Sequence, residues 1–403
     1  MREWHLITGE YPPQVGGVSD YTHLVASGLA AAGDTVHVWC PPCENSYPEV
    51  PGVTVHRELG GMRPRDLLHV TRMLDKYSAP RRLLVQWVPH AFGCRSANLP
   101  LSLWIWNRAF AHNDRVEIMI HEPFLSLQQE RLRHRALAVA HRIMLAMVLR
   151  AAARIWVAIP KWEEWCRPYA ERSVRFAWLP VMSNIPLNHQ TDASEAVRAQ
   201  YAPSNQYLIG HFGTCGGAIG RTLRAVLPEL LNGHAERAVL LIGEDGRSIR
   251  DEILRDCPQL GDRLHLTGLL PTEEVSSHIS ACDMMLQPYP DGASSRRSSL
   301  MAAISHGKPV VTTVGCLSEP LWHSSGGVLL CSAENHSELA AAVENLLANP
   351  CERLRLGREA KDLYDRHFDL RNIIDSLRSQ GHNLCDVTNI RCEDTANADS
   401  TNG

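Results

Sequence analysis

The chain has 403 residues, of which 44% are hydrophobic and 21% charged, a composition typical of a folded protein with two or three domains. Its net charge of −4 excludes a general attraction to nucleic acid, so any anion site must be local. The N-terminus shows no signal-peptide pattern. We therefore expect the 12 cysteines to be reduced thiols in a cytoplasmic protein. Cys40 and Cys43 have the spacing of half a zinc site, but no matching second pair follows, so no metal is expected.

The first half of the chain alternates between short apolar runs and helical patterns, which is typical of a parallel sheet. Strands are expected at residues 4–8, 35–39, 83–88, 116–120 and 155–159, and helices at 21–32 and 128–153. This pattern predicts one doubly wound domain over residues 1–190.

The helix expected at 128–153 combines a long apolar stripe with several arginines. We expect the stripe to be buried against the sheet; its members are Leu132, Ala136, Val139, Ile143, Met147 and Ala151. Charged residues interrupt the most apolar stretch of the chain, residues 136–159, so no membrane span is expected. The arginines leave open a peripheral contact with the inner face of a membrane.

Residues 187–204 are polar and weakly patterned, and we expect a linker there. The alternation then restarts and predicts a second doubly wound domain over residues 205–365. Its strands are expected at 208–212, 238–242, 264–266, 284–287 and 309–313, and its helices at 222–231, 272–281, 300–305, 338–348 and 352–368. The tail 381–403 is polar and short of large apolar residues, and we expect it to be disordered.

Two open α/β domains predict a ligand cleft between them, at the carboxyl ends of the strands. Gly16 and Gly17 follow the first strand, where the next helix would offer free N–H groups to an anion. His121 ends the strand 116–120, where it could donate a hydrogen bond to a substrate hydroxyl. An ordinary turn and a satisfied turn histidine are the respective alternatives.

Two further loops lie at strand ends in the second domain. The loop from Gly213 and Thr214 to Arg221 opens a helix and is placed to face a phosphate. The stretch PYPDGASSRRSSL puts Arg296 and Arg297 at another helix start. Ser298 or Ser299 is a suitable N-cap before Leu300, and arginine with helix N–H groups could hold an anion. The alternative for these arginines is a solvated pair.

Three stretches together resemble glycosyltransferase family 4, a family of the GT-B fold. They are EYPPQVGGV near the N-terminus, LHLTGLLPTEEVSSHISACDMMLQPYPDG, and AAISHGKPVVTT. The resemblance covers about residues 4–380. It implies two Rossmann-like domains facing across a cleft, with the acceptor side in the N-terminal domain, the sugar nucleotide in the C-terminal domain, and a helix over 366–380 that crosses back.

The resemblance also implies an activity: transfer of a sugar from a nucleoside diphosphate sugar, expected to be a UDP-sugar, with retention. The enzyme would be hexosyltransferase-like and metal-independent, need no cofactor, and use an unidentified glycan, small molecule or lipid as acceptor. The resemblance implies His121 for the transferred sugar and Gly268 and Leu269 for the base. For the diphosphate it implies Gly16, Gly17, Ser298, Ser299 and Leu300.

The chain departs from the family at two charged sites. Ser294 and Ala302 stand where the family has a pair of glutamates, and the positions of its arginine and lysine fall near Thr214 and Ile219. We therefore expect Arg296 and Arg297, with Arg221, to form a relocated phosphate clamp, and Asp291 to contact the sugar. A non-catalytic partner subunit or sugar-nucleotide sensor, and a sugar-nucleotide epimerase, stay open as alternatives.

Overall fold

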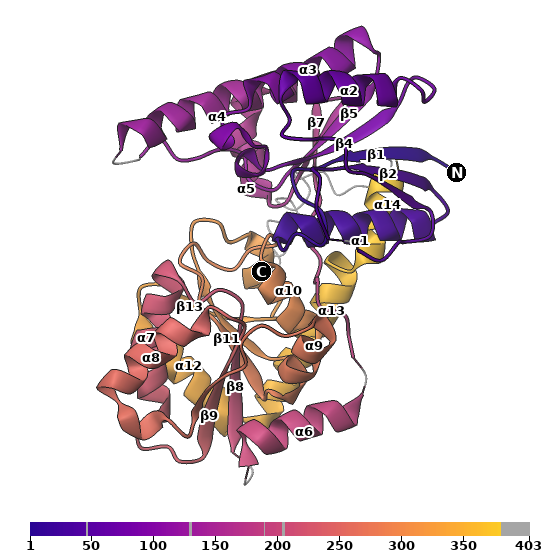
Figure 1. The fold of residues 1–403 in the computed structure, drawn as a ribbon. Coiled ribbons are helices and arrows are strands. Elements are labelled where there is room, and N and C mark those ends of the chain that lie inside the picture. Colours follow the sequence, from indigo (N-terminus) through magenta and orange to yellow (C-terminus); the bar gives the residue numbers. More distant parts are fainter. Residues whose placement is uncertain (46, 129–130, 189, 204–205, 380–403) are drawn as a thin grey trace, which may run out of the picture. The chain divides into compact units, whose positions relative to one another are not determined.

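The structure, a computed structural model, describes residues 1–45, 47–128, 131–188, 190–203 and 206–379, so the tail predicted at 381–403 lies outside it. The chain forms two compact units (Figure 1). Unit 1 comprises Met1–Pro180 and the segment from Leu370 on, and unit 2 comprises Val181–Asp369. Each unit has a parallel sheet flanked by helices, which confirms the predicted fold class.

Unit 1 contains a sheet of seven parallel strands in the order β3-β2-β1-β4-β5-β6-β7. The strands are β1 (Glu3–Ile7), β2 (Thr35–Trp39), β3 (Val53–His56), β4 (Arg82–Trp87), β5 (Arg115–Ile120), β6 (Arg154–Val157) and β7 (Arg175–Trp178). The helices are α1 (Gly17–Ala31), α2 (Pro64–Leu74), α3 (Leu99–Ala111), α4 (Leu132–Ala151), α5 (Pro160–Cys166) and α14 (Leu370–Arg378), with 3₁₀ turns η1 (Pro89–Ala91), η2 (Cys94–Ser96) and η3 (Arg167–Tyr169).

Helices α1 and α14 cover one face of this sheet, and α2, α3 and α4 cover the other (Figure 1). The approach of α14 depends on Gly28 in α1, because a Cβ there would lie 2.8 Å from the side chain of Ile374. Arg82 of β4 also donates to the carbonyl of Leu377 at 3.0 Å. The last described helix therefore completes the core of unit 1.

The buried face of α4 is not the predicted one. Leu132, Val139 and Ile143 are exposed, and the buried residues are Ala138, His141, Met144, Leu145, Val148, Leu149 and Ala151. Apolar residues lie all around this helix, so their spacing does not select one face. The ring of His141 is satisfied inside, because Nδ1 accepts from the Leu125 N–H at 3.2 Å and Nε2 lies 2.8 Å from the Ser96 carbonyl.

Unit 2 contains a sheet of six parallel strands in the order β10-β9-β8-β11-β12-β13. The strands are β8 (Tyr207–Phe212), β9 (Arg237–Ile242), β10 (Leu264–Leu266), β11 (Met284–Gln287), β12 (Val310–Val314) and β13 (Leu329–Ser332). The helices are α6 (Thr191–Tyr201), α7 (Gly217–Leu231), α8 (Gly246–Asp256), α9 (Thr272–Ala281), α10 (Ser298–Ser305), α11 (Pro320–Ser324), α12 (His336–Ala348) and α13 (Pro350–His367), with a 3₁₀ turn η5 (Pro258–Leu260).

The segment predicted as a linker contains helix α6. None of its residues is buried, which explains why the sequence shows no apolar stripe. Polar bonds hold the helix instead: Arg198 donates to the Ala281 carbonyl at 3.0 Å and to Asp283 at 2.7 Å. Hydrophobic periodicity cannot detect a helix that is attached in this way.

A cluster of histidines crosses one face of the sheet in unit 1. His5 on β1 stacks on His37 of β2 with ring centroids 5.0 Å apart, and His37 Nδ1 lies 3.1 Å from His56 Nε2 on β3. Trp39 donates its Nε1–H to His5 Nδ1 at 3.2 Å. Burial, and secondarily the neighbouring His37, lowers the pKa of His5 to about 3.

Acidification is therefore expected to destabilise unit 1. His5 in the unfolded chain has a pKa of about 6.5, so the stability is complete above that pH and is lost as the pH falls toward 3. Between pH 7 and pH 5 the loss from His5 alone should be about 2 kcal/mol in the free energy of unfolding. Urea denaturation at both pH values should show this loss in the wild type and a smaller one in His5→Asn, whose amide oxygen can still accept from Trp39.

The control for this measurement is His69→Asn, since His69 is exposed on α2 of the same unit. It should keep the pH dependence of the wild type. If His5→Asn also keeps it in full, the histidine cluster is not the cause.

Candidate functional site

The strand order of unit 2 reverses between β8 and β11. Ligands of doubly wound sheets bind at such a point, beyond the carboxyl ends of the strands. The loop that starts at Gly213 follows β8, and the loop of residues 288–297 follows β11. The switch point of unit 2 thus joins the two loops that the sequence singled out as anion sites.

These two loops approach each other closely. Gly213 has a φ of +119°, and a Cβ on it would lie 3.2 Å from the Ser299 Cβ at the start of α10. A Cβ on Gly243, after β9, would lie 3.5 Å from the Gly213 carbonyl oxygen, and Gly243 forms an isolated bridge with Gly268, after β10. Glycines therefore bring the ends of three neighbouring strands together.

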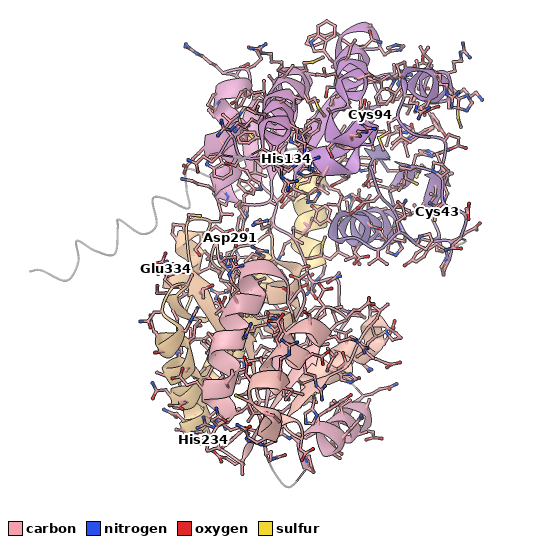
Figure 2. The ribbon with its side chains drawn as sticks, turned by 60° about the vertical axis from the view of Figure 1, so that its left-hand side comes forward. Cys43, Cys94, His134, His234, Asp291 and Glu334 are labelled. Atoms are coloured by element: carbon pink, nitrogen blue, oxygen red, sulfur yellow. The ribbon has the colours of Figure 1, made fainter. Side chains whose placement is uncertain are left out.

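Arg296 and Arg297 both form ion pairs with Asp291, which Figure 2 labels. Their side chains are only 19% and 23% exposed, so they are not a solvated pair. The guanidinium of Arg297 lies 4.8 Å from the Tyr289 ring centroid, and the Tyr289 hydroxyl lies 2.8 Å from Ser299 Oγ. Asp291 is expected from the sequence to contact a sugar, and in the structure its carboxylate is ion-paired with the two arginines that follow it in the same loop.

The N-terminus of α10 is uncapped within the described residues. Arg297 occupies the N-cap position, and no side chain accepts a hydrogen bond from the first turn. The predicted cap by Ser298 or Ser299 is therefore wrong, since both already lie inside the helix. The N–H groups that open α10 therefore lack a side-chain acceptor, and the arginine pair directly precedes them in the chain.

The N-terminus of α1 differs. Glu10 Oε1 accepts hydrogen bonds from the N–H groups of Val18 at 3.1 Å and Ser19 at 3.0 Å. A Cβ on Gly16 would lie 2.4 Å from the same oxygen, so this glycine makes room for the carboxylate. The expectation that the turn at Gly16 and Gly17 leaves these amides free for an anion is corrected, because Glu10 fills them.

One buried acid of unit 2, Glu319, has no motif that would mark it in the sequence. Glu319, after β12, accepts from the Ser295 N–H at 2.9 Å and from Trp322 Nε1–H at 2.6 Å. Burial raises the pKa of this carboxyl. Glu319 fixes the loop before Arg296, and only the tertiary fold brings it there, 24 residues along the chain.

His121, in unit 1, lies at the end of β5 as predicted and is nearly buried. Its Nε2–H donates to Gln86 Oε1 at 2.8 Å, and the Tyr21 ring packs edge-on with centroids 4.7 Å apart. Burial lowers the pKa of His121 to about 3, so the ring is neutral. Nδ1 then carries the lone pair, and the ring can accept a hydrogen bond from a hydroxyl through Nδ1 instead of donating one.

The remaining predicted residues are exposed on unit 2. Arg221 lies on α7, and no ion pair joins it to another described residue. Thr214 is exposed, and its carbonyl lies 3.3 Å from His211 Nε2. Leu269, directly after Gly268, is 75% exposed, so it presents an apolar side chain to solvent beside the bridged glycines.

The chain is similar to known proteins both in sequence and in structure. Residues 208–349 match the family described as glycosyl transferases group 1. The structure is similar to sucrose-phosphate synthase from Thermosynechococcus elongatus, with a TM-score of 0.70, 18% identity, and coverage of 94% of this chain and 98% of that one. The chain has the GT-B fold. The fold that the resemblance implied is thereby confirmed.

Two other GT-B structures have similar coverage. Anabaena HepE in complex with UDP gives a TM-score of 0.66 at 14% identity, with 94% of this chain and 99% of that chain covered. The α,α-trehalose-phosphate synthase (UDP-forming) of Burkholderia vietnamiensis gives 0.62 at 14% identity, with the same shares covered. No curated protein matches the chain by sequence. None of the helices within the described ranges is long and apolar enough to cross a membrane.

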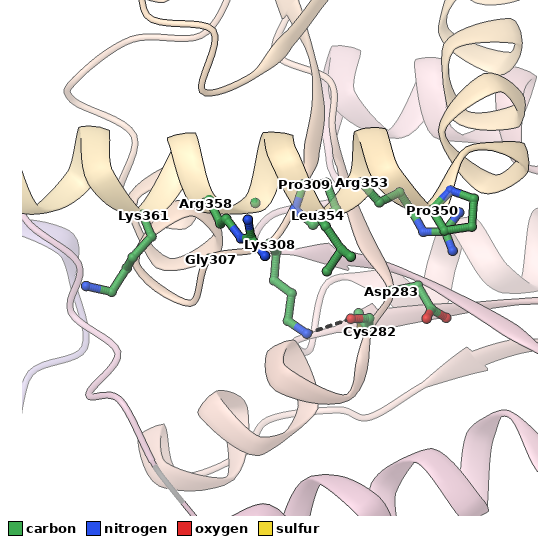
Figure 3. A pocket seen from close by; sticks show the side chains of 11 residues that line it. Cys282, Asp283, Gly307, Lys308, Pro309, Pro350, Arg353, Leu354, Arg358 and Lys361 are labelled. Atoms are coloured by element: carbon green, nitrogen blue, oxygen red, sulfur yellow. Dashed lines mark hydrogen bonds between the residues drawn. The ribbon is translucent and has the colours of Figure 1, made fainter.

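A pocket of about 570 Å³ lies beside the amino ends of β11 and β12, at the edge of the unit 2 sheet opposite the switch-point site (Figure 3). Lys308 lines it and donates from Nζ to the Ser280 and Cys282 carbonyls, the latter at 2.7 Å. This cation binds the C-terminal end of α9, where carbonyl groups are in excess. The charge of Lys308 is thus used structurally and does not belong to the switch-point site.

Removal of Glu319 should loosen the loop of residues 288–297. Glu319→Ala leaves the Ser295 and Trp322 donors buried without an acceptor, so the free energy of unfolding should fall by about 1–3 kcal/mol. Glu334→Ala is the control, since Glu334 is exposed in the same unit and should change stability by less than about 0.5 kcal/mol (Figure 2). Equal effects of the two variants in urea denaturation would contradict this role.

Proposed function

We propose that the protein is a glycosyltransferase that takes its sugar from a nucleoside diphosphate sugar. One observation carries the proposal: an uncapped helix N-terminus, a close-approach glycine and two mostly buried arginines meet at the switch point of unit 2. The match of residues 208–349 to glycosyl transferases group 1 supports it. The UDP bound to HepE, a protein of the same fold, favours a UDP-sugar as donor.

The chemistry requires stabilisation of the leaving diphosphate. The opening N–H groups of α10, at Ser298, Ser299 and Leu300, supply fixed dipoles for its charge. Arg296 and Arg297 supply charge-assisted hydrogen bonds, and each guanidinium has five N–H donors. Each arginine can therefore keep Asp291 and bind a phosphate oxygen as well, so Asp291 acts by positioning the arginines.

The other residues have supporting roles in the proposal. Gly213 and Thr214 let the diphosphate approach the backbone, and Arg221 adds a cation from α7. Leu269, beside Gly268, offers an apolar face to the nucleotide base. His121 accepts a hydrogen bond from a hydroxyl of the transferred sugar. The sugar passes to an unidentified acceptor with retention of configuration, and this scheme requires no metal.

The missing glutamate pair favours a second candidate. Ser294 and Ala302 are both fully buried, so neither position presents a carboxylate or an exposed polar group to a sugar. A non-catalytic relative that senses a sugar nucleotide would keep the diphosphate site and lack turnover. Detection of UDP release from UDP-glucose separates the two candidates.

Loss of an arginine should weaken UDP more than uridine. A hydrogen bond to a charged partner contributes about 1.5–3 kcal/mol, so Arg296→Ala or Arg297→Ala should reduce UDP affinity roughly 10- to 150-fold. Uridine lacks the diphosphate, and its affinity should change less than about threefold. Calorimetric titration with both ligands measures the difference.

Arg224→Ala provides the matched control. Arg224 lies on α7 of the same unit and is paired with Glu252 and Asp256 on the surface. The variant should bind UDP like the wild type. If neither Arg296→Ala nor Arg297→Ala separates UDP from uridine, the diphosphate is not held by this arginine pair.

A substitution at His121 should affect turnover and leave UDP affinity unchanged. His121→Ala removes the Nδ1 acceptor and should lower kcat for UDP release from UDP-glucose about two- to twelvefold, the value of one neutral hydrogen bond. His121→Asn, whose amide oxygen replaces Nδ1, should recover part of the loss. An equal drop in UDP affinity would show that His121 is structural.

A further inference from the structure

Every exposed position of α3 is apolar. These positions are Leu99, Leu103, Trp106, Phe110 and Ala111. The first four follow helical spacing and form one stripe along the helix. The rings of Trp106 and Phe110 lie 4.7 Å apart, and Phe110 is 59% exposed. The sequence pattern alone would bury such a stripe.

The inner side of α3 is already occupied. Trp104 donates from Nε1 to Thr71 Oγ1 on α2 at 2.8 Å, and Ile105 is fully buried. Arg108, also buried, donates from Nε to Asp114 at 2.6 Å. The exposed stripe is therefore not a core face that rotation of the helix would cover.

The neighbouring helix α4 extends this surface. Leu132, Val139 and Ile143 are exposed on it, and they belong to the stripe that the sequence predicted to be buried. Helices α3 and α4 pack against each other on the same face of the sheet (Figure 1). We call the two stripes together the α3–α4 surface.

The charged residues on the two helices of the α3–α4 surface are all basic. Neither helix contains an aspartate or a glutamate. Arg131, Arg133, Arg135 and Arg150 are exposed at the start, along and at the end of α4. Because the whole chain has a net charge of −4, this positive surface is a local feature.

An exposed apolar stripe of this kind marks a binding surface. Aromatic and aliphatic side chains bordered by arginines match the interface of an anionic bilayer, which offers acyl chains and phosphate groups together. A second copy of the chain would place two positive surfaces against each other, which is unfavourable. We propose that the α3–α4 surface docks on an anionic lipid bilayer, with Trp106 and Phe110 inserted among the headgroups and the arginines of α4 bound to lipid phosphates.

Flotation of the full chain with lipid vesicles tests the proposal. Vesicles of phosphatidylcholine with phosphatidylglycerol should bind the protein, and higher salt should weaken binding. Replacing Trp106 and Phe110 together by serine should lower the partition coefficient at least tenfold. Leu354→Ser is the control, since Leu354 is an exposed leucine on α13 of unit 2, and it should bind like the wild type.

The charges are tested separately. Arg131→Gln combined with Arg133→Gln should weaken binding to the anionic vesicles about thirtyfold, roughly fivefold for each charge. Binding to phosphatidylcholine alone should not change. All the substituted side chains are exposed, so thermal denaturation should be unaffected, and UDP binding should stay at the wild-type level because unit 2 is intact.

Three outcomes would overturn the proposal. The first is a wild-type protein that does not bind anionic vesicles. The second is a Trp106→Ser, Phe110→Ser variant that binds them as tightly as the wild type. The third is a wild-type dimer that this variant dissociates without any vesicle binding, which would assign the surface to a second copy of the chain. None of them bears on the proposed glycosyltransferase activity, which is read from UDP binding and UDP release.

Discussion

Parallel strands place all their carboxyl ends at one edge of a sheet, and the candidate site of unit 2 depends on this constraint. The loops after β8, β9 and β10 can converge only if their backbones approach closely, which Gly213, Gly243 and Gly268 allow. Ser299 at the start of α10 then lies against Gly213. A side chain at Gly213 would separate these elements and move the N–H groups of α10 away from the switch point.

Carboxylates decide which helix ends remain available to a ligand. Glu10 neutralises the start of α1, whereas α10 receives no such cap among the described residues. Asp291 holds the two arginines beside α10. Glu319 accepts a hydrogen bond from the N–H of Ser295, the residue before Arg296. Glu10 thus closes one helix start, while Asp291 and Glu319 hold the loop that carries the arginine pair at the other.

The sequence predicts elements well where burial is one-sided or complete. Helix Thr272–Ala281 and strand Met284–Gln287 begin and end where the pattern places them. It misses α6, which polar bonds attach, and it finds the helix α4 but not its buried face, because apolar residues occur on more than one side of that helix. The glycine loops and the arginine pair carry local motifs, but the partners of Asp291 and the place of Glu319 arise from tertiary contacts that no spacing encodes.

The return of the chain to unit 1 at Leu370 makes unit 2 an insertion within another folding unit. Ile373, Ile374 and Leu377 of α14 are buried in unit 1, so its core lacks part of its apolar contacts until they are synthesised. A ribosome releases all of unit 2 before it releases α14. Unit 2 can therefore fold first during synthesis, while the N-terminal segment, although made earlier, has to wait for the last helix to complete its core.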